Sequence, residues 1–423
     1  MKKNLIISCP LSSRSGYGDH ARDLVRSLVA MDMFNVEVLD QRWGNCPRTE
    51  LTERNEDLKP LVRSPKITQQ PDVWIQVTVP NEFQKVGKYN IGITAGMETT
   101  MVDPTWLEGC NRMDKVIVPS QHAKKVFESC TYDRMNQQTQ KKEGVLKLET
   151  PIDVLFEGLD LEVFNKTSKK SETVEKFMKE VKEDFCFLSV GHWLKGDIGH
   201  DRKDLGSVIA NFIQTFKKMG NKKPALIIKT SGATFSVVDR ENMRKKIGQF
   251  LDQKDSTIPS IYFLHGDLTT EELNALYNHT KVKAMVSFTH GEGFGRPLLE
   301  FSITGKPTLA PNWSGQVDFM KEHCILLGGE VKKVHPSAQW DKVILKESGW
   351  FYVNMPYASS AMKTVFKKYK NILIKSRKQT QYVKDNFSLD QMTKEFEVIM
   401  KESVSGMAER VELQLPKLET INE

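Results

Sequence analysis

One short stretch of the chain joins a flexible loop to two carboxylates. It reads THGEGFGRPLLEFSITGKP over residues 289–307, and Glu300 follows eight residues after Glu292. The loop itself is Gly291, Glu292, Gly293, Phe294 and Gly295. Its glycines would let successive backbone N–H groups face one side, and Pro297 is favoured at the first position of a helix. Because a helix N-terminus attracts phosphate, this pattern predicts a site for a phosphorylated ligand.

The two carboxylates indicate what the phosphate is attached to. A carboxylate is repelled by a neighbouring phosphate unless it faces hydroxyl groups instead. We therefore expect Glu292 and Glu300 to accept hydrogen bonds from sugar and ribose hydroxyls. The alternative is a surface helix with an acidic first turn, but that interpretation leaves the glycine loop without a purpose.

A second glycine cluster, SGYGDHA, lies near the N-terminus. Gly16, Gly18 and Ala21 fit a dinucleotide-binding pattern, and Asp40 ends the next strand where such folds keep an acid for the ribose. An NAD-dependent oxidoreductase is therefore one alternative. However, residues 10–15 separate the first strand from this loop, whereas a pyrophosphate turn begins at the strand end. We favour a loop whose backbone approaches a bound sugar or phosphate.

Loops of this kind need parallel strands to carry them, and the hydrophobic pattern predicts such strands. Runs rich in valine and isoleucine alternate with helical periodicity, which is typical of strands buried between helices. The first series is NLIISC, FNVEVLD, DVWIQVTV, YNIGIT, KVIVPS and IDVLFEG; after a charged stretch at 166–182 follow DFCFLSVG, PALIIKTSG, SIYFLHG, KAMVSFT and KPTLAP. We predict an α/β protein with two doubly wound, Rossmann-like domains.

Local signals place several other elements. Thr269 and Glu272 form a capping-box pattern, and Ser388 and Gln391 form a similar one before a helix near the C-terminus. That helix would present Leu389, Met392, Phe396 and Ile399 on one face. The polar segment 131–147 is expected to be an insertion.

The composition is that of a globular protein with two or three domains. The chain has 423 residues, of which 39% are hydrophobic and 27% charged. Six scattered cysteines, without zinc-site spacing, favour a reduced cytoplasmic setting. The opening MKKNLIISCP imitates a lipoprotein signal, but its apolar core is too short, so we expect a strand there. No segment is long enough to span a membrane.

The positive charge is unevenly distributed. The formal net charge is +7, and residues 361–387 hold eight basic residues against one acid. The basic residues are Lys363, Lys367, Lys368, Lys370, Lys375, Arg377, Lys378 and Lys384. Such a run is usually a solvated helix face, and otherwise a surface for a polyanion.

Residues 289–315, THGEGFGRPLLEFSITGKPTLAPNWSG, resemble the E-x7-E signature of the retaining family-4 glycosyltransferases, and in particular phage-encoded members. Further similar pieces occur in the family's order: MDKVIVPSQHAKKVF, VLFEGLDLEVF, FLSVGHWLKGDIGHDRKDL, PALIIKTSG and IYFLHGDLTTEELNALY. The resemblance is closest over residues 110–320. It implies the GT-B fold, in which two Rossmann-like domains face an interdomain cleft.

The resemblance also implies roles for individual residues. Glu292 would contact the sugar of a nucleotide diphosphate donor, with the N–H groups of residues 293–295 beside it, and Glu300 would hold the ribose. Arg202 and Lys203 would hold the diphosphate, and Lys229 is the candidate if they do not. The alternative for Arg202 and Lys203 is a solvated helix start. A UDP-sugar is favoured as donor, and no metal ion or other cofactor is expected.

Two positions depart from the family's pattern. Many relatives have a histidine near the reacting sugar in the N-terminal domain, but the corresponding stretch NIGITAGMETT offers Glu98 instead. Glu98 is therefore the candidate for the catalytic contact on that side. His192 replaces an arginine that is common after the first strand of the second domain, and we expect it to be a spectator.

The domain division and the acceptor complete the sequence-based predictions. Residues 1–168, joined by a C-terminal helix at 388–423, would form the acceptor domain, and residues 169–387 the donor domain. The favoured acceptor is a 5-hydroxymethylated pyrimidine in duplex DNA, since the basic run could meet phosphates and Trp43, in the loop DQRWGNCPR, could stack on a flipped base. The alternative is a cell-surface glycan or lipopolysaccharide, because membrane-surface acceptors also favour basic patches.

Overall fold

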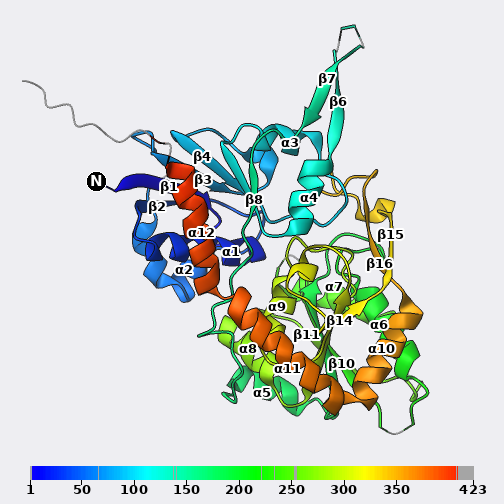
Figure 1. Ribbon diagram of the computed structural model, residues 1–423. Coiled ribbons are helices and arrows are strands. Elements are labelled where there is room, and N and C mark those ends of the chain that lie inside the picture. Colours follow the sequence, from blue (N-terminus) through cyan, green and yellow to red (C-terminus); the bar gives the residue numbers. More distant parts are fainter. Residues whose placement is uncertain are drawn as a thin grey trace, which may run out of the picture.

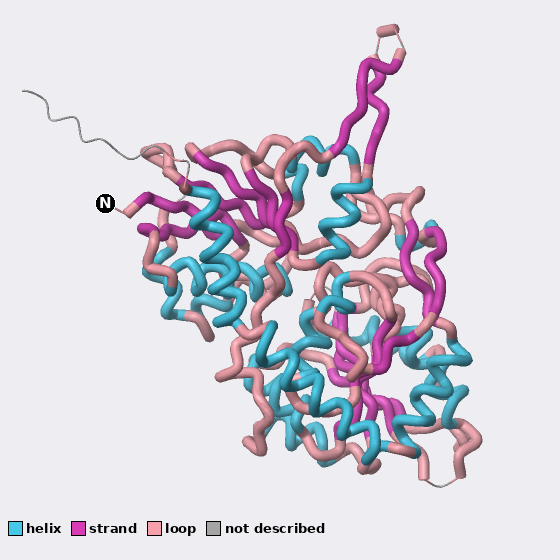
Figure 2. Tube along the Cα trace, viewed as in Figure 1, coloured by secondary structure: helices cyan, strands magenta, loops and turns pink. Residues whose placement is uncertain are grey.

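The structure is a computed structural model that describes residues 2–64, 66–136, 138–139, 141–220, 222–232, 234–251, 255–405 and 407. Two parallel six-stranded sheets form two units, which lie one above the other in Figures 1 and 2, with helices on both faces of each sheet. The prediction of an α/β protein with two doubly wound units is confirmed. Among the described residues, no helix is long and apolar enough to cross a membrane.

The first sheet is built from the N-terminal part of the chain. In spatial order its strands are β2 (Phe34–Asp40), β1 (Lys3–Cys9), β3 (Val73–Val77), β4 (Tyr89–Ile93), β5 (Lys115–Val118) and β8 (Ile152–Val154). Its cores hold α1 (Gly16–Ala30) and α12 (Leu389–Val404) on one side and α3 (Pro104–Cys110) and α4 (Gln121–Ser129) on the other; α2 (Glu50–Glu53) follows β2. The strand order reverses between β1 and β3, so the loops that follow them diverge, which is where such sheets bind ligands.

The second sheet begins where the hydrophobic pattern restarts. In spatial order its strands are β11 (Ile261–Leu264), β10 (Ala225–Ser231), β9 (Cys186–His192), β12 (Val282–Val286), β13 (Thr308–Pro311) and β14 (Ile325–Leu327). One core takes in α5 (Glu172–Lys179), α8 (Thr270–Asn278), α9 (Arg296–Ser302) and α11 (Tyr369–Asn386), and the other α6 (Leu205–Phe216), α7 (Val237–Gly248) and α10 (Met355–Lys367). Here the strand order reverses between β9 and β12.

The chain crosses between the units twice, and the two crossings lie side by side. The N–H of Leu159 donates to the carbonyl oxygen of Phe387, and the N–H of Leu389 donates to the carbonyl oxygen of Leu159. Gly158 has no room for a side chain there, because a Cβ atom would lie 2.7 Å from the Cα of Leu389. The helix α12 then packs on α1, as Figure 1 shows, and its predicted apolar face enters the core of the first unit. The domain boundary at 168 and 169 stays a prediction, and residues 408–423 of the predicted C-terminal helix lie outside the described residues.

Two antiparallel hairpins stand outside the parallel sheets. The predicted insertion is β6 (Thr131–Met135) and β7 (Lys142–Lys147), which project from the first unit in Figure 1. The second hairpin, β15 (Gly329–Lys333) and β16 (Gly349–Val353), was not predicted, because β15 is polar and exposed, β16 is short and apolar, and neither shows a clear alternation. It contacts the first unit through Gly349, whose N–H donates to Thr100 Oγ1 at 2.8 Å.

The helix starts follow the local signals in the sequence. The reciprocal capping box of Thr269 and Glu272 is present at the start of α8. Ser388 caps α12 by accepting from the N–H of Gln391. The helix α9 begins one residue before Pro297, because Gly295 adopts the left-handed conformation (φ 104°) that ends the loop.

Docking of α12 gives a stability prediction. Phe396 is fully buried in the core of the first unit, whereas Val398, on the same helix, is 56% exposed. Phe396→Ala should lower the free energy of unfolding by about 3–5 kcal/mol, since it leaves a cavity. Val398→Ala is the matched control and should change it by less than about 0.5 kcal/mol. Urea denaturation followed by circular dichroism measures both, and equal effects would show that α12 does not contribute to this core.

Candidate active site

The loops after β9 and β12 meet where the second sheet reverses its strand order. β9 and β12 are hydrogen-bonded neighbours, although β10 and β11 lie between them in sequence. The loop after β9 carries Arg202 and Lys203, and the loop after β12 carries Glu292. The N–H of His290 donates to the carbonyl oxygen of Arg202 at 2.7 Å, which joins the two loops.

The carboxylate of Glu292 lies between two cations. Lys203 Nζ is 2.5 Å from Glu292 Oε1, and Arg202 Nη1 is 3.0 Å from Glu292 Oε2. Arg202 Nη1 also lies 3.7 Å from Oε1 of Glu98, in the loop after β4 of the first unit. The structure thus brings the four predicted catalytic residues together from both units, and their roles stay predictions.

Burial and charge act in opposite directions on this cluster. Burial would raise the pKa of Glu292, but Lys203 and Arg202 outweigh it and the pKa lies below its usual value. For Glu98 burial outweighs the pull of Arg202, so its pKa is raised. Burial also lowers the pKa of Lys203, against the pull of Glu292. Two half-buried cations that face two carboxylates form a site in which an incoming dianion would replace the protein's own acids as their partner.

The glycine loop lies directly against the first unit. A Cβ atom on Gly293 would lie 1.7 Å from the carbonyl oxygen of Ala95, and one on Gly291 would lie 2.0 Å from that of Glu98. These two glycines are therefore required by the contact between units and not only by a ligand. No hydrogen-bond acceptor is found among the described residues for the N–H groups of residues 293–295, and their contact with a donor stays a prediction.

Phe294 contributes to the site through its backbone alone. Its side chain is 2% exposed, and its ring centroid lies 5.2 Å from that of Phe319 within the core of the second unit. This packing anchors the glycine loop in the core of the second unit.

A tyrosine that sequence reasoning missed holds the opposing loop of the first unit. The hydroxyl of Tyr17 accepts from the N–H groups of Ala95 and Gly96 at 3.0 and 2.8 Å. The ring of Trp43 stacks on Tyr17 with centroids 3.9 Å apart. Tyr17 covers one face of the Trp43 ring, and the stacking of Trp43 on a flipped base stays a prediction. An aromatic residue inside the SGYGDHA cluster was the only sequence signal for Tyr17.

The N-terminal glycine cluster does not form a dinucleotide turn. Gly18 is needed by the fold, because a Cβ atom would lie 2.1 Å from the carbonyl oxygen of Ser13, whereas Gly16 faces open space. Asp40 is occupied by the intervening loop, since its Oδ1 accepts from the N–H of Ser12 at 3.0 Å and its Oδ2 pairs with the hydroxyl of Ser12 at 2.6 Å. An acid held in this way is not free for a ribose, which argues against the oxidoreductase alternative.

Glu300 lies in a separate buried cluster on α9. Its Oε1 accepts from Arg296 Nε at 3.2 Å, and its Oε2 accepts from the hydroxyl of Tyr277 at 3.1 Å. Burial raises the pKa of Glu300 to about 8, against the pull of Arg296. Lys229 faces the same region: burial lowers its pKa, and the charge of Glu300 opposes that effect.

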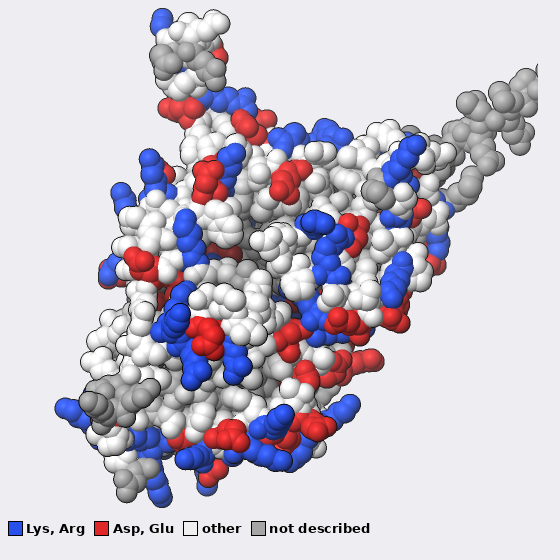
Figure 3. Space-filling model, turned by 180° about the vertical axis from the view of Figure 1, so that it is seen from behind, with Lys and Arg blue, Asp and Glu red and all other residues white. Residues whose placement is uncertain are grey.

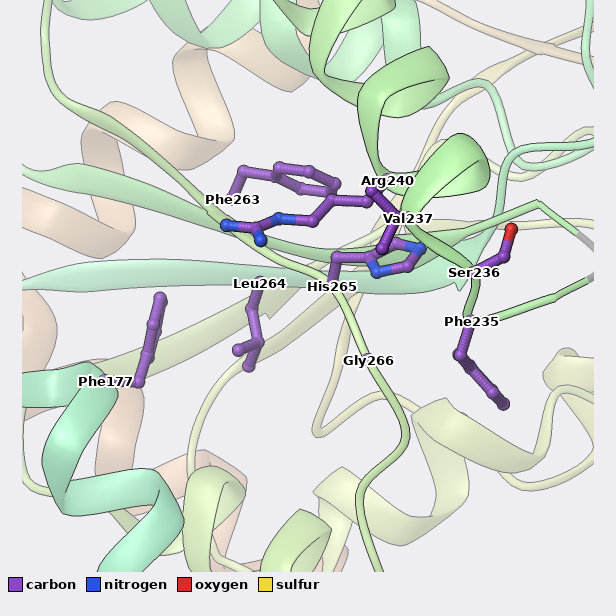
Figure 4. A pocket seen from close by; sticks show the side chains of 9 residues that line it. All are labelled: Phe177, Phe235, Ser236, Val237, Arg240, Phe263, Leu264, His265 and Gly266. Carbon is purple, nitrogen blue, oxygen red and sulfur yellow. The ribbon is translucent and has the colours of Figure 1, made fainter.

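A hollow beside Lys229 lies past the ends of β10 and β11. Its volume is about 380 Å³, and it is lined by Phe177, Phe235, Ser236, Val237, Arg240, Phe263, Leu264, His265 and Gly266. Figure 4 shows the side chain of Arg240 extending alongside the ring of Phe263. Lys229 Nζ lies 5.8 Å from the centroid of the Phe235 ring, which lines the hollow. The sequence did not indicate this hollow, because its lining comes from three separate segments.

The first unit does place a histidine at the junction, although not in the expected stretch. His122, from α4, packs edge-on against Trp313 of the second unit with ring centroids 4.7 Å apart. Its Nε2 atom is buried and finds no partner in the described part of the chain. His192, predicted to be a spectator, contacts Ser231 and has a pKa lowered by burial to about 4, so it is neutral at physiological pH.

Known proteins resemble this chain in structure and not in sequence. No family model matches the sequence, and no curated protein matches it. A glycosyltransferase from Rickettsia africae matches with a TM-score of 0.64 at 12% identity, over 96% of this chain and 99% of that one. Sucrose-phosphate synthase from Thermosynechococcus elongatus gives 0.63 at 12% identity, over 96% and 100%. Anabaena HepE in complex with UDP-glucose gives 0.56 at 12% identity, over 95% and 100%. The predicted GT-B fold is confirmed by these neighbours and by the two parallel sheets.

The buried acid on α9 gives a pH prediction. A carboxyl whose pKa is raised by folding stabilises the protein below its unfolded pKa, and that contribution is lost as the pH rises through its folded pKa, here about 8. Gln cannot ionise, so the melting temperature of Glu300→Gln relative to wild type should rise by about 3 °C between pH 7 and pH 9. Thermal unfolding across this range tests the trend. Glu56→Gln, at an exposed glutamate, is the control and should show none; a flat difference for Glu300→Gln would contradict the prediction.

Proposed function

We propose that this protein is a retaining, family-4-like glycosyltransferase that moves a sugar from a nucleotide diphosphate sugar to an acceptor hydroxyl. The observation that carries the proposal is the meeting of Arg202, Lys203 and Glu292 with Glu98 at the junction between the units. The GT-B fold supports it, and the UDP-glucose bound to one structural neighbour favours a UDP-sugar as donor.

The donor would lie across the two buried clusters. Its diphosphate would take Arg202 and Lys203 from Glu292, which would then accept hydrogen bonds from the sugar hydroxyls. The free N–H groups of residues 293–295 would face the same phosphates. Glu300 would hold the ribose, and the hollow beside Lys229 is the candidate seat of the nucleobase.

The chemical cost lies in the charge that develops as the sugar leaves. Negative charge grows on the diphosphate while the anomeric carbon becomes cation-like. Arg202, Lys203 and the loop N–H groups would meet the first demand, and the carboxylates of Glu292 and Glu98 would meet the second. The acceptor oxygen would attack from the side of the leaving group; the bond from the anomeric carbon to the diphosphate breaks, and the acceptor proton passes to a phosphate oxygen. No protein nucleophile and no metal ion is required in this scheme.

Substitutions of two residues proposed to contact the sugar donor should have different kinetic effects. Lys203→Ala removes a group that meets developing charge, so kcat should fall by about 10²- to 10³-fold. Glu300→Ala removes a contact made equally in ground and transition states, so it should chiefly raise the donor KM. Hydrolysis of UDP-glucose or another UDP-sugar measures both. Lys217→Ala, at a partly exposed lysine, is the control. Equal, small effects of both site variants would contradict the assignment.

For the acceptor we propose a 5-hydroxymethylated pyrimidine in duplex DNA, with a phage origin for the chain. All eight basic side chains of the 361–387 run are exposed, on α10, on α11 and at Lys368 between them, where they are free to meet phosphates. On the face in Figure 3, by contrast, basic and acidic side chains are interspersed. The alternative acceptor, a cell-surface glycan or lipopolysaccharide, has no observation of its own in the structure.

Salt dependence tests the DNA proposal. If about four phosphates are neutralised, the logarithm of affinity should fall with the logarithm of salt concentration at a slope of about −3.6. Replacing Lys367, Lys368 and Lys370 with Gln should flatten that slope by about 2.7 and leave donor hydrolysis unchanged. The control triple Lys176, Lys179 and Lys182→Gln removes exposed lysines elsewhere. Sugar transfer to lipopolysaccharide but not to hydroxymethylcytosine DNA would overturn this acceptor.

A further inference from the structure

Arg296 joins the donor-side helix to the first unit. It is the first residue of α9, and its side chain is 14% exposed. Its Nη1 atom lies 2.6 Å from Asp23 Oδ2 on α1, and its Nε atom 3.2 Å from Glu300 Oε1 on α9. Nη1 also lies 3.6 Å from Glu157 Oε2, just after β8. One guanidinium therefore contacts carboxylates from three separate segments.

This cluster has too few cations for its acids. Arg296 is the only basic side chain that the described residues bring within 4.0 Å of Asp23, Glu157 or Glu300. Burial raises the pKa of Glu157 to about 7 and that of Asp23 above its usual value, with Arg296 opposing both effects. His20 does not add a cation, since burial and Arg296 lower its pKa to about 3. The three acids therefore compete for one guanidinium.

The competition bears directly on Glu300. Its carboxylate is the one predicted to accept hydrogen bonds from a ribose, and only the ionised form has both oxygens free to accept. Removing Arg296 should raise the pKa of Glu300 further. Neutralising Asp23 should lower it, because the guanidinium then interacts mainly with Glu300. The charged and titratable groups that act on Glu300 are Arg296, Tyr277, Asp19 and Lys229, and Arg296 in turn is next to Asp23, Glu157 and His20.

We propose that Arg296 is a positioning residue that couples donor binding to the contact between the units: it orients Glu300 for the ribose and shares its charge with Asp23 of α1. This inference rests on the proposed function. Because the guanidinium is shared, a stronger interaction of Arg296 with Asp23 of α1 weakens its interaction with Glu300. The reverse also holds. The unit that carries α1 thereby influences the affinity of the other unit for the donor.

The test is nucleotide binding as a function of pH. UDP is titrated calorimetrically into wild type, Arg296→Gln and Asp23→Asn between pH 6 and pH 9.5. For wild type, affinity should rise with pH toward a plateau above about 8, as Glu300 ionises. Arg296→Gln should move this rise to higher pH by about one unit and weaken binding about tenfold at pH 7.5, whereas Asp23→Asn should move the rise to lower pH.

The pH profiles of Arg296→Gln and Asp23→Asn should shift in opposite directions. A folding defect would instead weaken UDP binding in both variants without shifting either profile. Arg26→Gln breaks an ion pair of the same helix that stays within the first unit, Arg26 to Asp57, and should leave the profile in place. Arg296→Lys keeps the charge and should restore most of the profile. In the double variant of Arg296→Gln and Asp23→Asn, the Asp23 substitution should have no further effect.

The outcomes distinguish this inference from the function on which it rests. Failure of wild type to bind UDP or UDP-glucose at millimolar concentration overturns the proposed function together with the role of Arg296. Normal binding with unmoved profiles in both variants, or with shifts in the same direction, overturns the inference alone.

Discussion

The close approach of two backbone segments is the constraint on which the junction depends. The glycine loop of the second unit lies so near the carbonyl oxygens of Ala95 and Glu98 that no Cβ atom fits at Gly291 or Gly293. A side chain at either position would push the units apart, and Arg202 would lose its contact with Glu98. The charged cluster exists because the backbone permits the contact.

The two loops that meet at the junction, residues 95–98 of the first unit and the glycine loop of the second, are each held by contacts within their own unit. Tyr17 accepts from two N–H groups of the first unit's loop, and the Phe294 ring is buried in the second unit's core. Hydrogen bonds and packing thus fix the two loops before any ligand arrives. A preorganised site of this kind does not need to reorder its dipoles when charge develops on a bound group.

The junction contains two clusters with opposite charge balance. Around Glu292, Arg202 and Lys203 face two carboxylates, so acid and base are matched. Around Arg296, one guanidinium faces three carboxylates, and burial keeps their pKa values high. The matched cluster suits a dianion that exchanges partners, and the acid-rich cluster suits hydroxyl groups and protons. This difference agrees with a diphosphate in one place and a ribose in the other.

The sequence by itself determined the local structure and the types of residue at the site. Valine-rich runs predicted both parallel sheets, Thr269 and Glu272 predicted a helix start, and Glu292 and Glu300 stood out because glycines and proline flank them. Only the tertiary structure decided which groups meet. Arg296 pairs with Asp23, 273 residues away, Trp43 stacks on Tyr17, and the hollow beside Lys229 is lined from three separate segments. Helix caps and strand periods depend on neighbours along the chain, so they can be predicted from it. Ion pairs, stacked rings and cavities depend on the packing of distant segments, which no local pattern specifies.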